Sequence, residues 1–361
     1  MKERIKRLRA VLTERELDGA LISNAQNRRY LSGFTGSAGY LLVTHGDAVL
    51  ATDFRYYEQS ATQAPDYRLH KQVTGFDAWV PPLFAGLAGK KIAFEAADLT
   101  VATHGHIRKA LTSLPETEQP QLVPTTNLVE GLRVYKEPGE IEALQKAVDL
   151  GDAAFVSVAE RVEPGWTEKQ VAWEIEKYIR EHGGDALSFD TIIAGGPWGA
   201  MPHAYPRERK LEAGEGVVID MGCDVAGYMS DLTRTIFLGK PDDQFKKIYD
   251  IVLTAQLTAE EMVKPGMTGN ECHMIAHNVI EAAGYGETFG HGLGHGIGLQ
   301  VHEAPRVGRT SNDALHDAMV FTIEPGIYVT GWGGVRIEDM VVLENGRARV
   351  MSKSPKLRFV G

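Results

Sequence analysis

The sequence has little cysteine, no long hydrophobic run and no excess of basic residues. Its two cysteines, Cys223 and Cys272, exclude a disulfide framework, and a reducing cytoplasm is the expected compartment. No apolar stretch approaches the ~20 residues that span a membrane, and the charged, amphipathic residues 1–23 indicate a surface helix rather than a signal peptide. The net charge of −10 argues against nucleic acid or an anionic membrane as a partner.

Motifs of covalent hydrolysis and of nucleotide binding are also missing. The chain has no G-x-S-x-G sequence and neither cysteine lies in a nucleophilic motif, so a serine or cysteine nucleophile is not indicated. The glycines of FTGSAG, residues 34–39, lack the spacing of a dinucleotide-binding or phosphate-binding loop. We therefore expect a structural turn there.

Length and composition predict a two-domain protein. The 361 residues exceed the usual size of a single core, and the hydrophobic fraction of 43% is ample for packed cores. Residues 1–125 alternate helix-like and strand-like segments, which is typical of a mixed sheet with helices on its faces. The polar, proline-containing segment 117–127 marks a boundary, so the predicted domains are residues 1–125 and 126–361.

The second domain repeats itself. Residues 162–184 resemble residues 263–286, and each copy follows another predicted helix, at residues 140–160 and 242–263. A predicted hairpin follows each copy. Two such units predict a pseudo-twofold domain in which the helices cover the sheet.

Four carboxylates occupy matching positions in the two copies. Asp220 and Asp231 in the first copy correspond to Glu324 and Glu338 in the second. Each stretch predicts an apolar strand that ends in an acid, a glycine-rich turn, and a second strand that carries another acid. A lone acid on a strand is usually solvated or paired with a base, but four at matched positions are costly without positive charge among them. A pair of divalent metal ions is the predicted occupant.

Histidines accompany these acids. His291 and His295 lie in a glycine-rich segment that allows a substrate to approach closely, and His203 matches His302 across the repeat. We expect these four side chains to share one cleft with the acids. His295 has no metal-binding counterpart in the first copy.

A second histidine pair has the spacing of a zinc site. His273 and His277 are four residues apart on a predicted helix. The pair lacks the glutamate of a metalloprotease helix, so we predict a surface or packing role instead.

The ligand chemistry narrows the metal and the reaction. Four carboxylates and one imidazole form a hard, oxygen-rich set that suits Mn²⁺, with Co²⁺, Zn²⁺ or Fe²⁺ as alternatives. Two such ions ~3.5–4 Å apart can activate water and polarise a carbonyl together. This set suits hydrolysis of an amide or ester.

These motifs resemble the pita-bread (M24) metallopeptidase family, in its branch of Xaa-Pro dipeptidases (prolidases) and Xaa-Pro aminopeptidases (aminopeptidase P). The resemblance covers essentially the whole chain, and is carried by YLSGFTGSAG, ATDFRYYEQ, LRVYKEPGEIEALQKA, HGLGHGIGLQVHE, TIEPGIY and GVRIED. It implies an α/β (α+β) fold with a creatinase-like N-terminal domain and a pseudo-twofold pita-bread catalytic domain. It also implies a homodimer.

The resemblance assigns the metal ligands by position. They would be Asp220, Asp231, His295, Glu324 and Glu338. Asp231 and Glu338 would bridge two ions, and Glu324 would also accept the proton of the attacking water.

Further roles follow from the same resemblance. His291 and His302 would bind the scissile carbonyl and stabilise the tetrahedral intermediate, and His203 would shuttle a proton or bind substrate from the opposite side. Arg336 would orient a bridging carboxylate. Arg306 would clamp the free carboxylate of a dipeptide.

The expected reaction is hydrolysis of the Xaa-Pro bond, with dipeptides favoured by the compact length and the short HEAPR region. Removal of the N-terminal residue from longer Xaa-Pro peptides is the alternative. Creatinase shares the fold without this metal set, methionine aminopeptidase lacks the N-terminal domain, and a non-catalytic binding module usually lacks the ligands. These three therefore fit less well.

Overall fold

The computed structural model describes residues 2–356 and 359–360, and the chain divides into two compact units between Arg133 and Val134. This division lies beyond the boundary expected at residue 125. The reason is that α6 (Glu130–Arg133) is bound to the first unit. Arg133 Nη1 donates to Asn27 Oδ1 at 2.7 Å, and Asn27 Nδ2 donates to Glu130 Oε1 at 2.7 Å.

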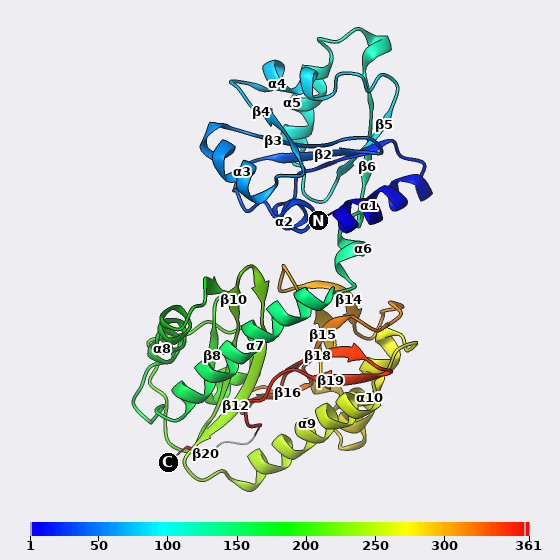
Figure 1. Ribbon diagram of the computed structural model, residues 1–361. Coiled ribbons are helices and arrows are strands. Elements are labelled where there is room, and N and C mark those ends of the chain that lie inside the picture. The colour runs from blue at the N-terminus through cyan, green and yellow to red at the C-terminus, as the bar shows by residue number, and fades with distance from the viewer. Residues whose placement is uncertain (1, 357–358, 361) are drawn as a thin grey trace. The chain divides into compact units, whose positions relative to one another are not determined.

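A six-stranded mixed sheet forms the centre of the first unit (Figure 1). Its order is β4 (Arg68–Lys71), β3 (Ala48–Thr52), β2 (Tyr40–Thr44), β1 (Gly19–Ile22), β5 (Lys91–Glu95) and β6 (Gln121–Thr125). β2 is antiparallel to β1 and β3, whereas the other neighbours are parallel. Pro124, from the predicted boundary segment 117–127, lies in β6. It is tolerated there because β6 is an edge strand.

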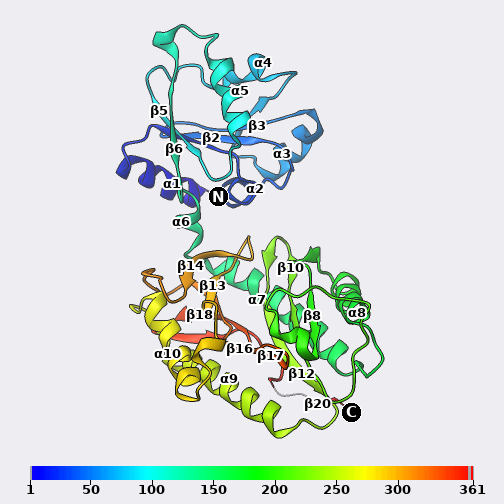
Figure 2. The same cartoon turned by 180° about the vertical axis from the view of Figure 1, so that it is seen from behind.

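Helices cover both faces of this sheet, as predicted. α4 (Phe76–Leu83) and α5 (Val101–Leu111) lie on one face, and α1 (Lys2–Glu14) and α2 (Ala25–Ser32) lie on the other (Figures 1 and 2). Every residue of β1 is buried, which is expected for a strand covered on both sides. None of the described helices is long and apolar enough to cross a membrane.

The second unit contains two halves of matching construction. The first half pairs α7 (Pro138–Ala159) and α8 (Glu168–Glu181) with the sheet β20 (Phe359–Val360), β12 (Leu232–Leu238), β9 (Gly216–Met221) and β8 (Ile192–Gly195). The second pairs α9 (Asp243–Met262) and α10 (Gly269–Ala282) with β14 (Glu303–Val307), β13 (Gly294–Gly296), β15 (Val320–Ile323), β18 (Asp339–Glu344) and β19 (Arg347–Val350). The helix pairs confirm the predicted repeat. Both α8 and α10 begin with a capping box, which satisfies the amide groups of the first turn.

The carboxylate-bearing hairpins differ from the simple hairpins expected. β9 pairs with β12 and β15 pairs with β18, but a smaller hairpin replaces each glycine-rich turn. These inner hairpins are β10 (Cys223–Val225) with β11 (Tyr228–Met229), and β16 (Gly326–Val329) with β17 (Gly333–Arg336). The first turns tightly because Ala226 and Gly227 both have positive φ, at 51° and 79°, as a two-residue hairpin turn requires.

Strand alternation directs the acids away from the helices. Ile219 packs in a core with Phe155 of α7 and Ile175 of α8, so its neighbour Asp220 lies on the opposite face. In the second half Ile323 packs with α9 and α10, which likewise directs Glu324 to the other face. The helices thus cover one side of each sheet and leave the other side for the site.

Candidate metal centre

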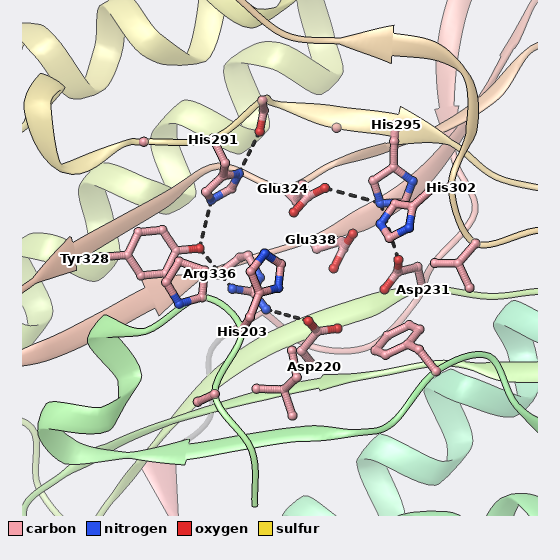
Figure 3. Close-up of a pocket in the computed structure, with 18 of the residues that line it drawn as sticks. His203, Asp220, Asp231, His291, His295, His302, Glu324, Tyr328, Arg336 and Glu338 are labelled. Carbon is pink, nitrogen blue, oxygen red and sulfur yellow. Dashed lines mark hydrogen bonds and ion pairs between the residues drawn. The ribbon is translucent and has the colours of Figure 1, made fainter.

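A cavity of about 910 Å³ lies in the second unit, and side chains from both halves line it (Figure 3). The volume is near the upper end of the ~300–1,000 Å³ range of ligand pockets. The predicted site residues that line it are His203, Asp220, Asp231, His291, His295, His302, Glu324, Arg336 and Glu338. Arg306 is outside this lining.

The acids lie where each outer strand pair opens into its inner hairpin. Asp220 is near the end of β9 and Asp231 directly precedes β12. Glu324 directly follows β15 and Glu338 directly precedes β18. This equivalence brings one pair of acids from each half to the same cavity.

His295 has the tautomer of a metal ligand. Its Nδ1 lies 3.1 Å from the Gly296 carbonyl, which accepts a hydrogen bond from it and leaves the Nε2 lone pair free. Nε2 lies 3.6 Å from Asp231 Oδ2 and 3.4 Å from Glu324 Oε1. Burial, together with His302, lowers the pKa of His295 to about 4, so the ring is neutral.

One cluster of three residues is compact enough to hold an ion. Ligand atoms of Asp231, His295 and Glu338 all lie within 4.8 Å of one another. Such a set of two carboxylates and an imidazole offers the oxygen and nitrogen ligands that Mn²⁺ or Zn²⁺ binds.

The buried carboxylates of the cavity are stable in their charged form only with additional positive charge beside them. Burial and the neighbouring carboxylates raise the pKa values of Asp231 and Glu338 well above their usual range, and burial raises the pKa of Glu324 to about 7. Among the described residues that line the cavity, Arg336 is the one arginine or lysine. Asp220 Oδ1 is buried without a hydrogen-bond partner in the described structure. This donor set therefore fits divalent cations.

Two hydroxyl residues that sequence reasoning missed support the acids. Thr233 Oγ1 donates to Glu338 Oε2 at 2.6 Å and accepts from Arg336 Nε at 3.1 Å. The hydroxyl of Tyr328 accepts from Arg336 Nη1 at 2.9 Å, and Arg336 Nη2 donates to Asp220 Oδ2 at 2.5 Å. The sequence offered one signal, the position of Tyr328 in TIEPGIY, whereas the position of Thr233 opposite Asp220 comes from the strand pairing in the structure.

His291 continues this chain of hydrogen bonds. Because Tyr328 accepts from Arg336, its hydroxyl proton is free to donate to His291 Nε2, 2.9 Å away. Nδ1 of His291 then donates to the Gly292 carbonyl at 2.8 Å. Burial and Arg336 lower the pKa of His291 to about 4, which agrees with a neutral ring. A bond from His291 to a substrate carbonyl would require the ring to give up the one to Gly292.

His203 and His302 are exposed to the cavity. The ring of His302 contacts the ring of His295 edge-on, with centroids 4.3 Å apart. Figure 3 shows His203 and His302 beside the acids in the cavity.

Arg306 lies on β14, directly opposite His295 in the β13–β14 pair. Residues opposite one another in an antiparallel pair have side chains on the same face of the sheet. The side chain is exposed. Arg306 thus starts from the same face as a proposed metal ligand without lining the cavity.

The second histidine pair has a packing role. His273 and His277 are buried on α10 against Phe289, with ring centroids 5.2 and 6.4 Å from it. Arg309 Nη2 lies 3.0 Å from His277 Nε2. The packing alternative predicted from the sequence is therefore confirmed over the surface one.

His273 should make the fold sensitive to acid. Burial, with His277 and Arg309 nearby, lowers its pKa from 6.5 to about 4. The contribution of His273 to the free energy of unfolding is therefore full above pH 6.5 and is lost as the pH falls toward 4, by about 1–2 kcal/mol at pH 5. Urea unfolding at pH 7 and pH 5 should show that acid lowers the free energy of unfolding less in His273→Leu than in wild type. His182→Leu, at the exposed end of α8, is the control, and an equal acid loss in His273→Leu would contradict the assignment.

Comparisons with known proteins identify the family of the chain. Residues 142–345 match metallopeptidase family M24, and residues 4–135 match the creatinase/prolidase N-terminal domain. An Xaa-Pro dipeptidase of Pyrococcus horikoshii is 34% identical, over 99% of this chain and 98% of its own.

Solved structures of Xaa-Pro peptidases also resemble this chain over nearly its whole length. An Xaa-Pro dipeptidase from Bacillus anthracis is 39% identical with a TM-score of 0.93, and the match covers 99% of each chain. An X-Pro aminopeptidase from Thermotoga maritima is 34% identical with a TM-score of 0.89, over 99% of this chain and 100% of that one. The chain therefore belongs to metallopeptidase family M24 and carries a creatinase/prolidase N-terminal domain.

Proposed function

We propose that this protein hydrolyses the Xaa-Pro bond of dipeptides with the help of two divalent cations, with Mn²⁺ as the natural metal. The observation that carries the proposal is the convergence of four carboxylates and His295 from both halves on one cavity. The relatives named Xaa-Pro dipeptidase support the choice of substrate. The residues that would hold the two cations are Asp220, Asp231, His295, Glu324 and Glu338.

Side chains of the protein would transfer the proton and bind the substrate. When bound, two divalent cations would supply an activated water and polarise the scissile carbonyl. Glu324, whose Oε1 accepts a hydrogen bond from Thr322 at 3.2 Å, would take the proton of that water. His302 and His203, both exposed to the cavity, would hold the carbonyl oxygen and the reacting nitrogen.

Arg336 and its partners would keep the acids in place. Arg336 contacts Asp220 directly and reaches Glu338 through Thr233. We propose that His291 acts on this arrangement through Tyr328 as well as on the substrate. Arg336 would thus orient the carboxylates.

The cavity also suits the proline side of the substrate. An Xaa-Pro bond has no N–H group, so it needs shape rather than a hydrogen-bond acceptor around the pyrrolidine ring. Apolar and aromatic lining residues are available for that contact: Phe189, Ile192, Ala204, Tyr205 and Val301.

An aminopeptidase that acts on longer Xaa-Pro peptides is the second candidate, favoured by the X-Pro aminopeptidase structure among the similar ones. Rates on Leu-Pro and on Leu-Pro-Gly with Mn²⁺ separate the two functions. We expect a kcat/KM at least tenfold higher for Leu-Pro. A higher value for Leu-Pro-Gly would replace the dipeptidase with the aminopeptidase, and no cleavage of either would reject both.

Arg306 is the proposed clamp for the free carboxylate of a dipeptide. Its position opposite His295 supports this role, because residues opposite one another in an antiparallel pair have side chains on the same face of the sheet. Arg306→Gln should raise KM for Leu-Pro about tenfold with little change in kcat. Arg309→Gln, three residues on, is the control. An unchanged KM in Arg306→Gln would remove the clamp.

We also propose a cytoplasmic homodimer. Both cysteines are free and buried, which suits a reducing compartment, and the resemblance to the Xaa-Pro branch is the basis for the dimer. Sedimentation of the purified protein should give about twice the 39.5 kDa mass of one chain. A monomer at micromolar concentration would contradict it.

A further inference from the structure

A largely buried network of ion pairs and hydrogen bonds adjoins the strands next to two of the proposed ligands; its members are Arg234, Asp339, Lys356, Glu260 and Gln256. Arg234 Nη2 donates to Asp339 Oδ1 at 2.6 Å, and both side chains are 1% exposed. Lys356 Nζ lies 2.8 Å from Asp339 Oδ2 and donates to Glu260 Oε1 at 2.9 Å. Two basic and two acidic side chains therefore contact one another here; Lys356 is 22% exposed and the other three are buried.

This network holds the backbone of two proposed metal ligands. Arg234 Nη1 donates to the carbonyl of Glu338 at 2.5 Å. Gln256 Nε2 bonds Asp339 Oδ2 at 3.0 Å and reaches the carbonyl of Ile323, the residue before Glu324, at 3.4 Å. A shift of Asp339 would therefore move the start of β18, next to Glu338, and the end of β15, next to Glu324.

The C-terminal segment, residues 351–356, completes the network. The carbonyl of Ser354 accepts from Arg234 Nη2 at 3.0 Å. The amides of Lys353 and Ser354 donate to the carboxylate of Asp152 on α7, at 2.6 and 3.1 Å. These bonds fix the segment so that Lys356 reaches Asp339 and Glu260.

We propose that Lys356 is a positioning residue for the metal centre, an inference that rests on the proposed metal-dependent function. Loss of its ammonium would leave Asp339 and Glu260 buried with Arg234 alone. Buried charge without a partner is strongly unfavourable, so the structure would relax until water reaches these acids. That relaxation would move Glu338, because Arg234 bonds Asp339 and the Glu338 carbonyl at once.

The test compares Lys356→Met with Lys353→Met in the full chain. Lys353 is on the same segment, but its pair with Asp149 is exposed, with the lysine side chain 73% accessible. Isothermal titration with Mn²⁺ should show the dissociation constant raised at least tenfold in Lys356→Met, and changed less than twofold in Lys353→Met and Lys356→Arg. A lowered melting temperature of the metal-free Lys356→Met protein with unchanged Mn²⁺ affinity would overturn the proposal, since it would indicate a purely structural role.

A compensating variant keeps the proposal testable if Lys356→Met does not fold. The double variant Lys356→Met/Glu260→Gln removes one charge of each sign, so Arg234 and Asp339 again balance. It should fold and bind Mn²⁺ within about threefold of wild type. Recovery of folding without recovery of Mn²⁺ affinity would overturn the proposal. A wild-type protein that binds no Mn²⁺ would instead refute the proposed function.

Discussion

Replacement of Glu324 by glutamine is expected to lower kcat/KM for Leu-Pro by about 10²- to 10⁴-fold. The amide keeps the size of the side chain and an oxygen that can accept from Thr322, but it cannot take a proton. Initial rates with saturating Mn²⁺ at neutral pH measure the effect. Titration of Mn²⁺ into the same variant shows how much of the loss comes from weaker metal binding.

Glu344→Gln is the matched control for this experiment. Glu344 ends β18, in the same half of the catalytic unit, and pairs with Arg349 at the surface, where its side chain is 38% accessible. Its rate should stay within about twofold of wild type. Full activity of Glu324→Gln would remove Glu324 as the proton acceptor, whereas equal losses in both variants would indicate a general effect of altered charge.

The proposed ligands were predictable because the sequence repeats. Asp220 lies near the end of one apolar strand and Glu324 directly follows another, and matched acids in two copies are hard to explain as surface residues. Strand alternation then fixed the face on which they lie. The structure brings these predicted residues to one cavity, while their individual roles stay proposals.

The supporting residues were not predictable in the same way. Thr233 and Tyr328 carry no charge, and hydroxyl residues are common in strands, so their type alone signals nothing. Thr233 meets Arg336 only where β12 approaches β17, and Tyr328 meets it only through the pairing of β16 with β17. Register depends on pairing between distant segments, which the local pattern does not contain.

Contacts between distant segments also explain why the domain boundary and the inner hairpins were not predicted from the sequence. The sequence prediction assigned residues 126–133 to the second domain, but bonds from Asn27, about a hundred positions earlier, attach Glu130 and Arg133 to the first unit. The inner hairpins contain strands as short as Tyr228–Met229, too short for an alternating pattern to be recognised.

Removal of divalent cations should destabilise the protein, and more so at alkaline pH. Burial raises the pKa of Glu324 to about 7 and raises those of Asp231 and Glu338 well above their usual range. Between about pH 4.5 and 7 the metal-free fold therefore holds protons that the unfolded chain has lost, so its stability falls as the pH rises through this window. Bound cations replace those protons, and their affinity rises with pH.

Melting temperatures with EDTA and with excess Mn²⁺ at pH 6 and pH 8 measure this effect. One site filled at 100 times its dissociation constant adds about 2.7 kcal/mol, so two sites should raise the melting temperature by roughly 10 °C or more. The gap between the EDTA and Mn²⁺ curves should be wider at pH 8. A gap that narrows from pH 6 to pH 8 would contradict the assignment of the buried carboxylates as ligands.

Glu338→Gln separates ion binding from a general effect of Mn²⁺ on the fold. The amide oxygen can still accept from Thr233 Oγ1, but one of the crowded negative charges is gone. Without metal at pH 8 this variant should melt at a higher temperature than wild type, because repulsion with Asp231 and Glu324 is relieved. With Mn²⁺ it should gain much less than wild type does. A residue that destabilises the metal-free protein and is required for its stabilisation by Mn²⁺ acts as a ligand, since a purely structural acid would not reverse its effect when the metal is added.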